Sequence, residues 1–191
     1  HADRMFEGMP LCAGIIGARR GYLYLRAEYR HLREPLETVL QRRRDAGLLG
    51  SGIAGTDGFD FDIEIHMGAG AYICGEESSL IESLEGKRGM PRLRPPYPVQ
   101  KGFRDRPTVI NNVKTLASVP WIVANGAGAF NSLGTAEAPG TTLLQLGGAV
   151  KRPGVAEVPF GATLKEIIDK IETSMASSKD SADAFRSINT E

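Results

Sequence analysis

The chain has 191 residues, with 23 basic and 23 acidic side chains, so its formal net charge is zero. This length is enough to bury a hydrophobic core and to hold one domain with a small second one. The charge balance argues against a nucleic-acid partner or an anionic membrane surface. No apolar run is long enough to span a bilayer and no signal segment opens the chain, so we expect membrane association only through partner subunits.

Two cysteines, Cys12 and Cys74, cannot supply the four ligands of a zinc ion or an iron–sulfur cluster. We interpret both as small buried residues in a reducing compartment, which predicts a cytoplasmic protein. Because the chain opens on His1 and not on methionine, we expect a piece of a longer polypeptide.

Apolar residues recur at helical spacing over residues 3–18, which predicts an amphipathic helix. Pro10, close to Gly8, is expected to kink this helix or break it in two. Residues 22–25 are apolar on both faces, as in an interior strand of a covered parallel sheet.

A second helix is predicted from Pro35, in its first turn, to Gly47, with a glycine-rich loop over residues 47–58. Strict alternation then predicts a strand over residues 60–67. This order is typical of a doubly wound α/β sheet, in which ligands bind beyond the carboxyl ends of the strands.

The sequence Gly-Ala-Gly-Ala-Tyr-Ile-Cys-Gly-Glu-Glu-Ser-Ser-Leu-Ile-Glu-Ser follows at residues 68–83. Its Gly-x-Gly lets a ligand approach the backbone, although about half of such loops are tight turns without a ligand. Glu76 and Glu77 open the next helix, where they stabilise the helix dipole and disfavour a phosphate. A nucleotide at this loop would therefore present hydroxyl or amide groups, and its phosphates would be held elsewhere.

Residues 86–110 are rich in proline and predicted to be irregular. The basic residues of this segment either pair with the acidic helix or build a site, and we weigh the two interpretations equally; they are Lys87, Arg88, Arg92 and Arg94.

Asn111 and Asn112 precede a helix that is predicted to reach Gly126, with a bend at Pro120. One asparagine is explained by N-capping alone. Together with Thr115 the pair would also form a neutral, donor-rich site that suits a phosphate.

A shift to small, turn-forming residues near 131–140 suggests a boundary between domains at 1–136 and 137–191. Strands are predicted at 141–146 and 155–158, on either side of a turn at 151–154.

Thr163 and Glu166 form a predicted capping box that opens a helix. Residues 174–191 are polar and show no clear periodicity.

The run at 68–83 and the Asn-Asn-x-x-Thr of residues 111–115 resemble the flavin-binding, NADH-oxidising subunit of respiratory complex I. They also resemble the diaphorase subunits of NAD-reducing hydrogenases and NAD-dependent formate dehydrogenases. The resemblance covers roughly residues 1–170. It implies a Rossmann-like, doubly wound FMN-binding domain followed by a partial β-grasp domain of the SLBB type. It further implies hydride transfer between NAD(H) and FMN, with electrons passed on to iron–sulfur clusters.

The resemblance also implies binding residues by position. Those expected at the flavin ring and dinucleotide are Gly68, Gly70, Tyr72, Gly75, Glu76, Glu77, Arg94 and Tyr97. Those expected at the ribityl–phosphate end of the flavin are Asn111, Asn112 and Thr115. We expect no catalytic acid, base or nucleophile and no metal ligand, because the flavin carries the chemistry.

The family also has an earlier glycine-rich phosphate loop and a later cysteine group that binds a 4Fe-4S cluster, and this chain contains neither. We therefore expect the isolated chain to be inactive and its partners to be NADH and iron–sulfur subunits. Two alternatives remain: a non-catalytic module that docks subunits, and a subunit of the membrane ferredoxin:NAD reductase type. Residues 24–29 look closer to the hydrogenase and formate dehydrogenase diaphorases than to complex I.

Overall fold

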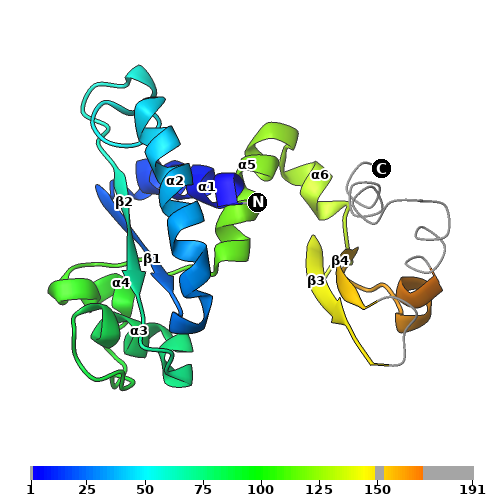
Figure 1. Cartoon of the computed structure of the whole chain (residues 1–191). Helices are drawn as coiled ribbons and strands as arrows, with labels where there is room; N and C mark the ends of the chain where they lie inside the picture. Colours follow the sequence, from blue (N-terminus) through cyan, green and yellow to red (C-terminus); the bar gives the residue numbers. More distant parts are fainter. Residues whose placement is uncertain (1, 149–152, 170–191) are drawn as a thin grey trace. The chain divides into compact units, whose positions relative to one another are not determined.

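The computed structural model describes residues 2–148 and 153–169. The chain divides into two compact units, one up to Pro120 and one from Trp121 onward (Figure 1). The α-helices whose two ends lie within the described residues are α1 (Ala2–Ile16), α2 (Arg33–Asp45), α3 (Glu77–Leu84), α4 (Pro98–Lys101), α5 (Val113–Asn125) and α6 (Ala127–Asn131). The strands are β1 (Arg20–Leu25), β2 (Asp62–Met67), β3 (Thr141–Leu146) and β4 (Gly154–Pro159). Short 3-10 turns are η1 (Ala27–Leu32), η2 (Ile53–Gly55), η3 (Tyr72–Gly75) and η4 (Phe103–Asp105).

In the first unit, β1 and β2 pair in parallel, with Arg20 beside Asp62 and Leu25 beside Met67. The two predicted strands are thereby confirmed, β1 starting two residues earlier than expected and β2 two residues later. Because the strands are parallel, their carboxyl ends meet at one edge of the sheet.

One face of this sheet is covered by α1 and α2, which pack against it in Figure 1. Phe6 and Leu40, one from each helix, are almost completely buried together with Ile63 of β2. The whole core cluster is Met5, Phe6, Met9, Ala13, Leu23, Leu40, Leu49, Ile53, Phe61 and Ile63. The hydrophobic core of this unit therefore lies between the sheet and these two helices.

The opposite face of the sheet contacts segments that follow β2 in the chain. The ring of Tyr22 lies 5.1 Å from that of Phe103 in η4. The hydroxyl of Tyr24 lies 2.8 Å from the hydroxyl of Ser83 in α3. Since side chains of successive strand residues point to opposite faces, both faces of the sheet are covered.

Of the two outcomes expected at Pro10, the break is wrong, because one helix runs from Ala2 to Ile16, whereas the kink stays a prediction. Pro10 is buried, and its helical neighbours Phe6 and Met9 lie in the core, so packing offsets the proline's cost of about 3 kcal/mol. Gly8 has a packing role instead. A Cβ there would lie 1.9 Å from the carbonyl oxygen of Leu116, so α1 and α5 approach too closely for a side chain.

The expectation that residues 86–110 are irregular throughout is also wrong, since they contain α4 and η4. Pro98 is the first residue of α4, where its missing N–H costs nothing. The side chain of Gln100 then accepts a hydrogen bond from the backbone N–H of Tyr97.

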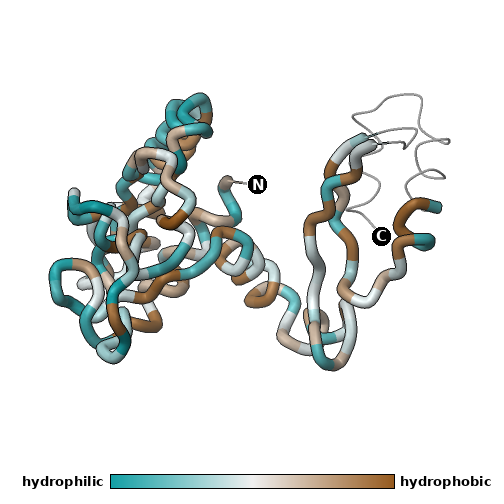
Figure 2. Tube along the Cα trace, turned by 90° about the horizontal axis from the view of Figure 1, so that it is seen from below, coloured by the Kyte–Doolittle hydropathy of each residue, from teal (hydrophilic) through white to brown (hydrophobic). Residues whose placement is uncertain are grey.

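The second unit contains the predicted hairpin, in which β3 and β4 pair antiparallel from Thr141 beside Pro159 to Leu146 beside Gly154. Hydrophobic residues form separate bands along these strands in Figure 2. One face packs on a helix over residues 164–169, whose Ile167 is buried.

The capping box that opens this helix is confirmed, because Thr163 and Glu166 bond each other through both side chains and both N–H groups. Part of the predicted turn at 151–154 and all of the tail at 174–191 lie outside the described residues, and the domain boundary at 136 stays a prediction. Within the described ranges, no helix is long and apolar enough to cross a membrane.

Candidate functional site

The candidate site is built on the loop of residues 68–75, here called the central loop, which leaves β2 at the carboxyl edge of the sheet. The N–H of Gly68 donates to the carbonyl oxygen of Leu25, 2.8 Å away, so the loop continues the sheet before it turns out. Gly70 has φ +84°, a conformation that favours glycine. A Cβ at Gly70 would lie 3.3 Å from a carboxylate oxygen of Glu28, just beyond β1.

The central loop presents backbone donors. Among the hydrogen bonds of the described residues, none uses the N–H groups of residues 69–73. This stretch is largely exposed, and the side chain of Tyr72 is 91% exposed. A row of amides without acceptors suits a ligand rich in carbonyl oxygens and ring nitrogens, such as the isoalloxazine ring of a flavin.

Glu76 is committed to the protein. It is the N-cap of α3, and its carboxylate accepts from the N–H of Ser79 at 2.9 Å and the hydroxyl of Ser78 at 2.6 Å. Its other oxygen is paired with Arg94. Burial alone would raise the pKa of Glu76, but the hydrogen bonds from Ser78, Ser79 and Arg94 outweigh it and lower the pKa to about 2. Glu76 therefore stays ionised and holds the start of α3.

Glu77, the first residue of α3, has more capacity for a ligand. One of its oxygens lies 3.1 Å from Nη1 of Arg94. No hydrogen bond between described residues reaches its other oxygen, and its side chain is 38% exposed. The guanidinium of Arg94 thus bridges the two glutamates and leaves the trio with one net negative charge.

Charge pairing explains most of the basic character of the proline-rich segment. Arg92 pairs with Glu82 and lies 3.2 Å from Glu85, and Lys87 lies 2.6 Å from Glu85. The backbone N–H of Arg92 also donates to the buried hydroxyl of Ser78. The segment is therefore attached to both ends of α3: Arg92 reaches Glu82 and Ser78, and Arg94 reaches the N-cap Glu76.

The start of α5 forms a second cluster of donors. Asn112 caps this helix, because its carboxamide oxygen accepts from the N–H of Lys114 at 2.9 Å. Asn111 and Thr115 are exposed beside it, and the first turn carries no acidic residue. These neutral donors fit a phosphate better than the glutamate end of α3 does. No hydrogen bond or ion pair between described residues joins this cluster to the central loop.

The structure therefore brings Glu76, Glu77 and Arg94 together. The central loop and the start of α5 each present donors of their own. Tyr97 lies at the N-cap of α4 and is half exposed.

Sequence reasoning missed two residues beside the central loop, Glu28 and Ser78. Ser78 is only 1% exposed and bonds both Glu76 and the backbone of Arg92. A hydroxyl two residues after a capping carboxylate is the signal that points to this arrangement. The approach of Glu28 to Gly70 follows only from the pairing of the strands.

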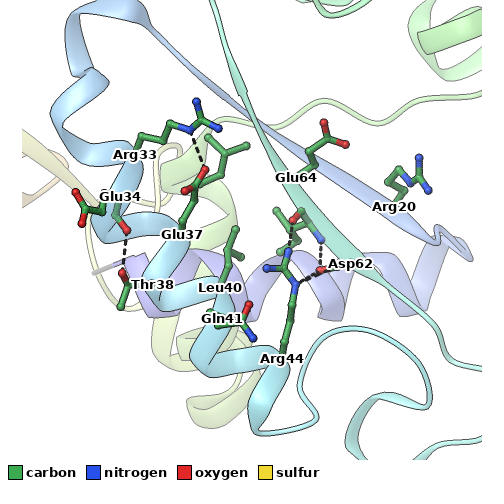
Figure 3. A pocket seen from close by; sticks show the side chains of 12 residues that line it. Arg20, Arg33, Glu34, Glu37, Thr38, Leu40, Gln41, Arg44, Asp62 and Glu64 are labelled. Atoms are coloured by element: carbon green, nitrogen blue, oxygen red, sulfur yellow. Dashed lines mark hydrogen bonds and ion pairs between the residues drawn. The ribbon is translucent and has the colours of Figure 1, made fainter.

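A hollow of about 750 Å³ lies between α2 and β2 (Figure 3), away from these residues. Its charges are largely satisfied within the protein, since Arg33 bonds Glu37 at 2.8 Å and Arg44 bonds Asp62 at 3.0 Å. None of the predicted site residues lines it, so it is not the site the sequence indicates. In the described part of the chain, no three His, Cys, Asp or Glu residues form a group that could hold a metal ion.

Comparison with known proteins agrees with the resemblance of the two motifs. The family model described as the Nuo51 FMN-binding domain matches residues 1–121. The α subunit of the NAD-reducing hydrogenase HoxS of Cupriavidus necator is 53% identical over 165 residues, which cover 86% of this chain and 27% of that protein. An NADH-quinone oxidoreductase subunit of Aquifex aeolicus is 48% identical, over 87% of this chain and 39% of its own length.

A solved structure is similar as well. The crystal structure of an NAD+-reducing NiFe hydrogenase in the H2-reduced state superposes with a TM-score of 0.77 and 46% identity, over 88% of this chain and 28% of the matched chain. This chain therefore spans 27–39% of the length of these relatives. It belongs to the Nuo51 FMN-binding domain family.

Proposed function

We propose that this chain is part of an NADH:acceptor oxidoreductase subunit that passes hydride between NAD(H) and FMN and electrons on to iron–sulfur clusters. The observation that carries the proposal is the central loop. Its unbonded amides of residues 69–73 lie at the carboxyl edge of a parallel sheet and are followed at once by Glu77, whose carboxylate has a free oxygen. The family and the relatives named above support the same activity.

The charged residues indicate which part of FMN each group of donors would bind. The central loop, from Gly68 to Gly75 with Tyr72 on its surface, would hold the flavin ring. Asn111, Asn112 and Thr115 would hold its ribityl–phosphate end, because the start of α5 has no acidic residue and is rich in donors.

Glu77 would accept hydrogen bonds from the dinucleotide, and Arg94 and Tyr97 would lie beside it. Glu76, which the resemblance places at the flavin, would act mainly by fixing the start of α3.

FMN, when bound, supplies the hydride and electron chemistry. The residues of this chain then bind and orient the two ligands and keep water away from the reacting atoms. In this proposal no side chain transfers a proton.

The finer architecture belongs to the same proposal. The two covered faces of the β1–β2 sheet support a doubly wound, Rossmann-like domain over residues 1–136. The hairpin and the helix after it support a β-grasp domain of the SLBB type from residue 137. A cytoplasmic subunit that docks iron–sulfur partners, including a 4Fe-4S cluster outside this chain, completes the proposal.

Purification of the intact subunit that carries this sequence tests the proposal. We expect a yellow protein with one FMN per polypeptide, whose flavin absorbance is bleached by NADH in the absence of oxygen. An intact, folded subunit that binds no flavin would refute the proposed function, and so would flavin that NADH cannot reduce.

A further inference from the structure

We propose that Tyr24 is a positioning residue for the central loop, holding the backbone donors of the loop and the start of α3 in one fixed arrangement. This inference rests on the proposed function and deepens it. Tyr24 touches neither ligand in this scheme, and it acts through Gly68 and Ser83.

The first observation is the contact beneath the loop. A Cβ added to Gly68 would lie 2.3 Å from the hydroxyl oxygen of Tyr24 and 2.4 Å from its ring carbon Cζ. Gly68 is buried, so the backbone of the loop rests directly on the tyrosine with no space between them. A rigid ring below the first residue of the loop limits how far the amides of residues 69–73 can move.

The second observation is the bond from the same tyrosine to α3. The hydroxyl of Tyr24 lies 2.8 Å from that of Ser83, 59 residues later in the chain. Ser83 belongs to the same helix that begins with Glu77. One hydroxyl therefore links the floor of the central loop to the helix that carries the carboxylate proposed for the dinucleotide.

The third observation is that the tyrosine is itself fixed. Its ring stacks on the imidazole of His66, with centroids 5.7 Å apart and planes inclined by 23°. Burial raises the pKa of Tyr24, and the bond to Ser83 only partly offsets this. The hydroxyl therefore stays protonated and able to bond Ser83 throughout the neutral range.

The test uses Tyr24→Phe and Ser83→Ala in the intact, FMN-loaded subunit. The phenylalanine keeps the ring on His66 and removes only the hydroxyl, and Ser83→Ala removes the same hydrogen bond from its other end. We expect each variant to weaken FMN binding by about three- to tenfold, the effect of one net hydrogen bond. The double variant should bind FMN no more weakly than Tyr24→Phe alone, because that variant already removes the bond that Ser83→Ala removes.

Two further measurements separate positioning from simple stability. The amides of residues 69–73 should exchange with deuterium faster in both variants, and the visible spectrum and reduction potential of the bound flavin should shift. Tyr22→Phe is the matched control, because Tyr22 lies two residues earlier on the same strand face and packs on Phe103 instead. That variant should leave FMN affinity, flavin spectrum and loop exchange unchanged.

The results that refute the role of Tyr24 differ from those that refute the proposed function. If the parent subunit binds FMN and Tyr24→Phe matches Tyr22→Phe in affinity, spectrum and exchange, the positioning role is refuted. A variant that only melts at a lower temperature, with unchanged flavin properties, refutes it equally. A parent subunit that binds no FMN refutes the proposed function itself.

Discussion

At the residue scale, the structure separates two neighbouring carboxylates that the sequence presents as a pair. Glu76 has protein donors on both oxygens, whereas Glu77 shares only Arg94. A change to glutamine therefore has a different effect at each position. At Glu76 it weakens the N-cap of α3, and at Glu77 it removes the charge of a carboxylate that is available to a ligand.

For Glu77→Gln in the intact subunit, we expect weaker NADH binding with unchanged flavin content. Charge-assisted hydrogen bonds to the dinucleotide should lose about 1–2 kcal/mol, roughly a tenfold rise in the NADH concentration needed for half-maximal rate. Steady-state kinetics with an artificial electron acceptor measure this. If the NADH dependence is unaltered, Glu77 only stabilises the start of the helix, a contribution of about 0.3–1 kcal/mol.

For Glu76→Gln, we expect a loss of stability that depends on pH. The folded state lowers the pKa of Glu76 from 4.5 to about 2, so the carboxylate stabilises the fold above pH 4.5 and this contribution disappears as the pH falls towards 2. Urea unfolding of parent and variant should therefore differ at pH 7 and converge in acid. A difference that is constant between pH 7 and pH 3 would contradict the assigned pKa.

At the scale of the element, the helix α5 offers a test that separates capping from phosphate binding. Aspartate caps a helix as well as asparagine does, but it places a negative charge where the phosphate is proposed. We expect Asn112→Asp to keep the stability of the subunit and to reduce its flavin content sharply, since like-charge repulsion costs about 1–3 kcal/mol. Thermal unfolding and flavin absorbance are measured on the same samples.

The control for this experiment is Asn112→Ala, which removes the cap without adding charge and should cost about 1 kcal/mol of stability. Full flavin content in Asn112→Asp would mean that the segment is only a helix cap.

The close crossing of α1 and α5 predicts a second effect at this scale. Gly8→Ala should destabilise the first unit by about 1–3 kcal/mol, because its Cβ would meet the backbone of Leu116. Gly14→Ala in the same helix is the control, since its Cβ would lie 3.3 Å from the ring of Phe59, which needs to shift by only a few tenths of an ångström. The Gly14→Ala variant should change the free energy of unfolding by less than about 1 kcal/mol. Equal stabilities of the two variants would contradict the close approach of α1 to α5 at Gly8.

The strands and most helices could be predicted from the sequence, because alternation, helical spacing and capping residues are local signals. The predicted ends of β1, β2, β3 and β4 lie within two residues of the ends in the structure. The turn of the hairpin and the tail are not part of this comparison. The passage of α1 through Pro10 could not be predicted, since it depends on the core that the helix joins. Nor could the bond between Tyr24 and Ser83, because 59 residues separate them.

For the candidate site, the motifs predicted the central loop, the glutamates and the capping asparagine. They left open which glutamate is free and whether Arg94 pairs with the acidic helix, since both depend on how the proline-rich segment folds back on α3.

At the scale of the whole molecule, the candidate ligand groups lie on the surface of the first unit. Tyr72 is 91% exposed, and Asn111, Asn112 and Thr115 are exposed as well. We therefore expect the 191-residue chain, expressed alone, to purify with little or no FMN, because hydrogen bonds to donors open to water replace bonds to water and contribute little net free energy.

The intact subunit purified in the same way is the control, and flavin absorbance against protein absorbance is the measurement. A yellow 191-residue chain with one FMN per polypeptide would show that the site is complete within it.

Arg44 and Asp62, drawn in Figure 3, together occupy both backbone hydrogen-bonding groups of Ile63 in β2. Arg44 donates to the carbonyl oxygen of Ile63 at 2.9 Å, and Asp62 accepts from the N–H of the same residue at 2.8 Å. These are two backbone groups that a strand from another molecule would need in order to extend the sheet. A strand from another molecule can pair with Ile63 only after displacing Arg44 and Asp62, so we expect these two side chains, which also hold α2 against the sheet, to disfavour edge-to-edge association.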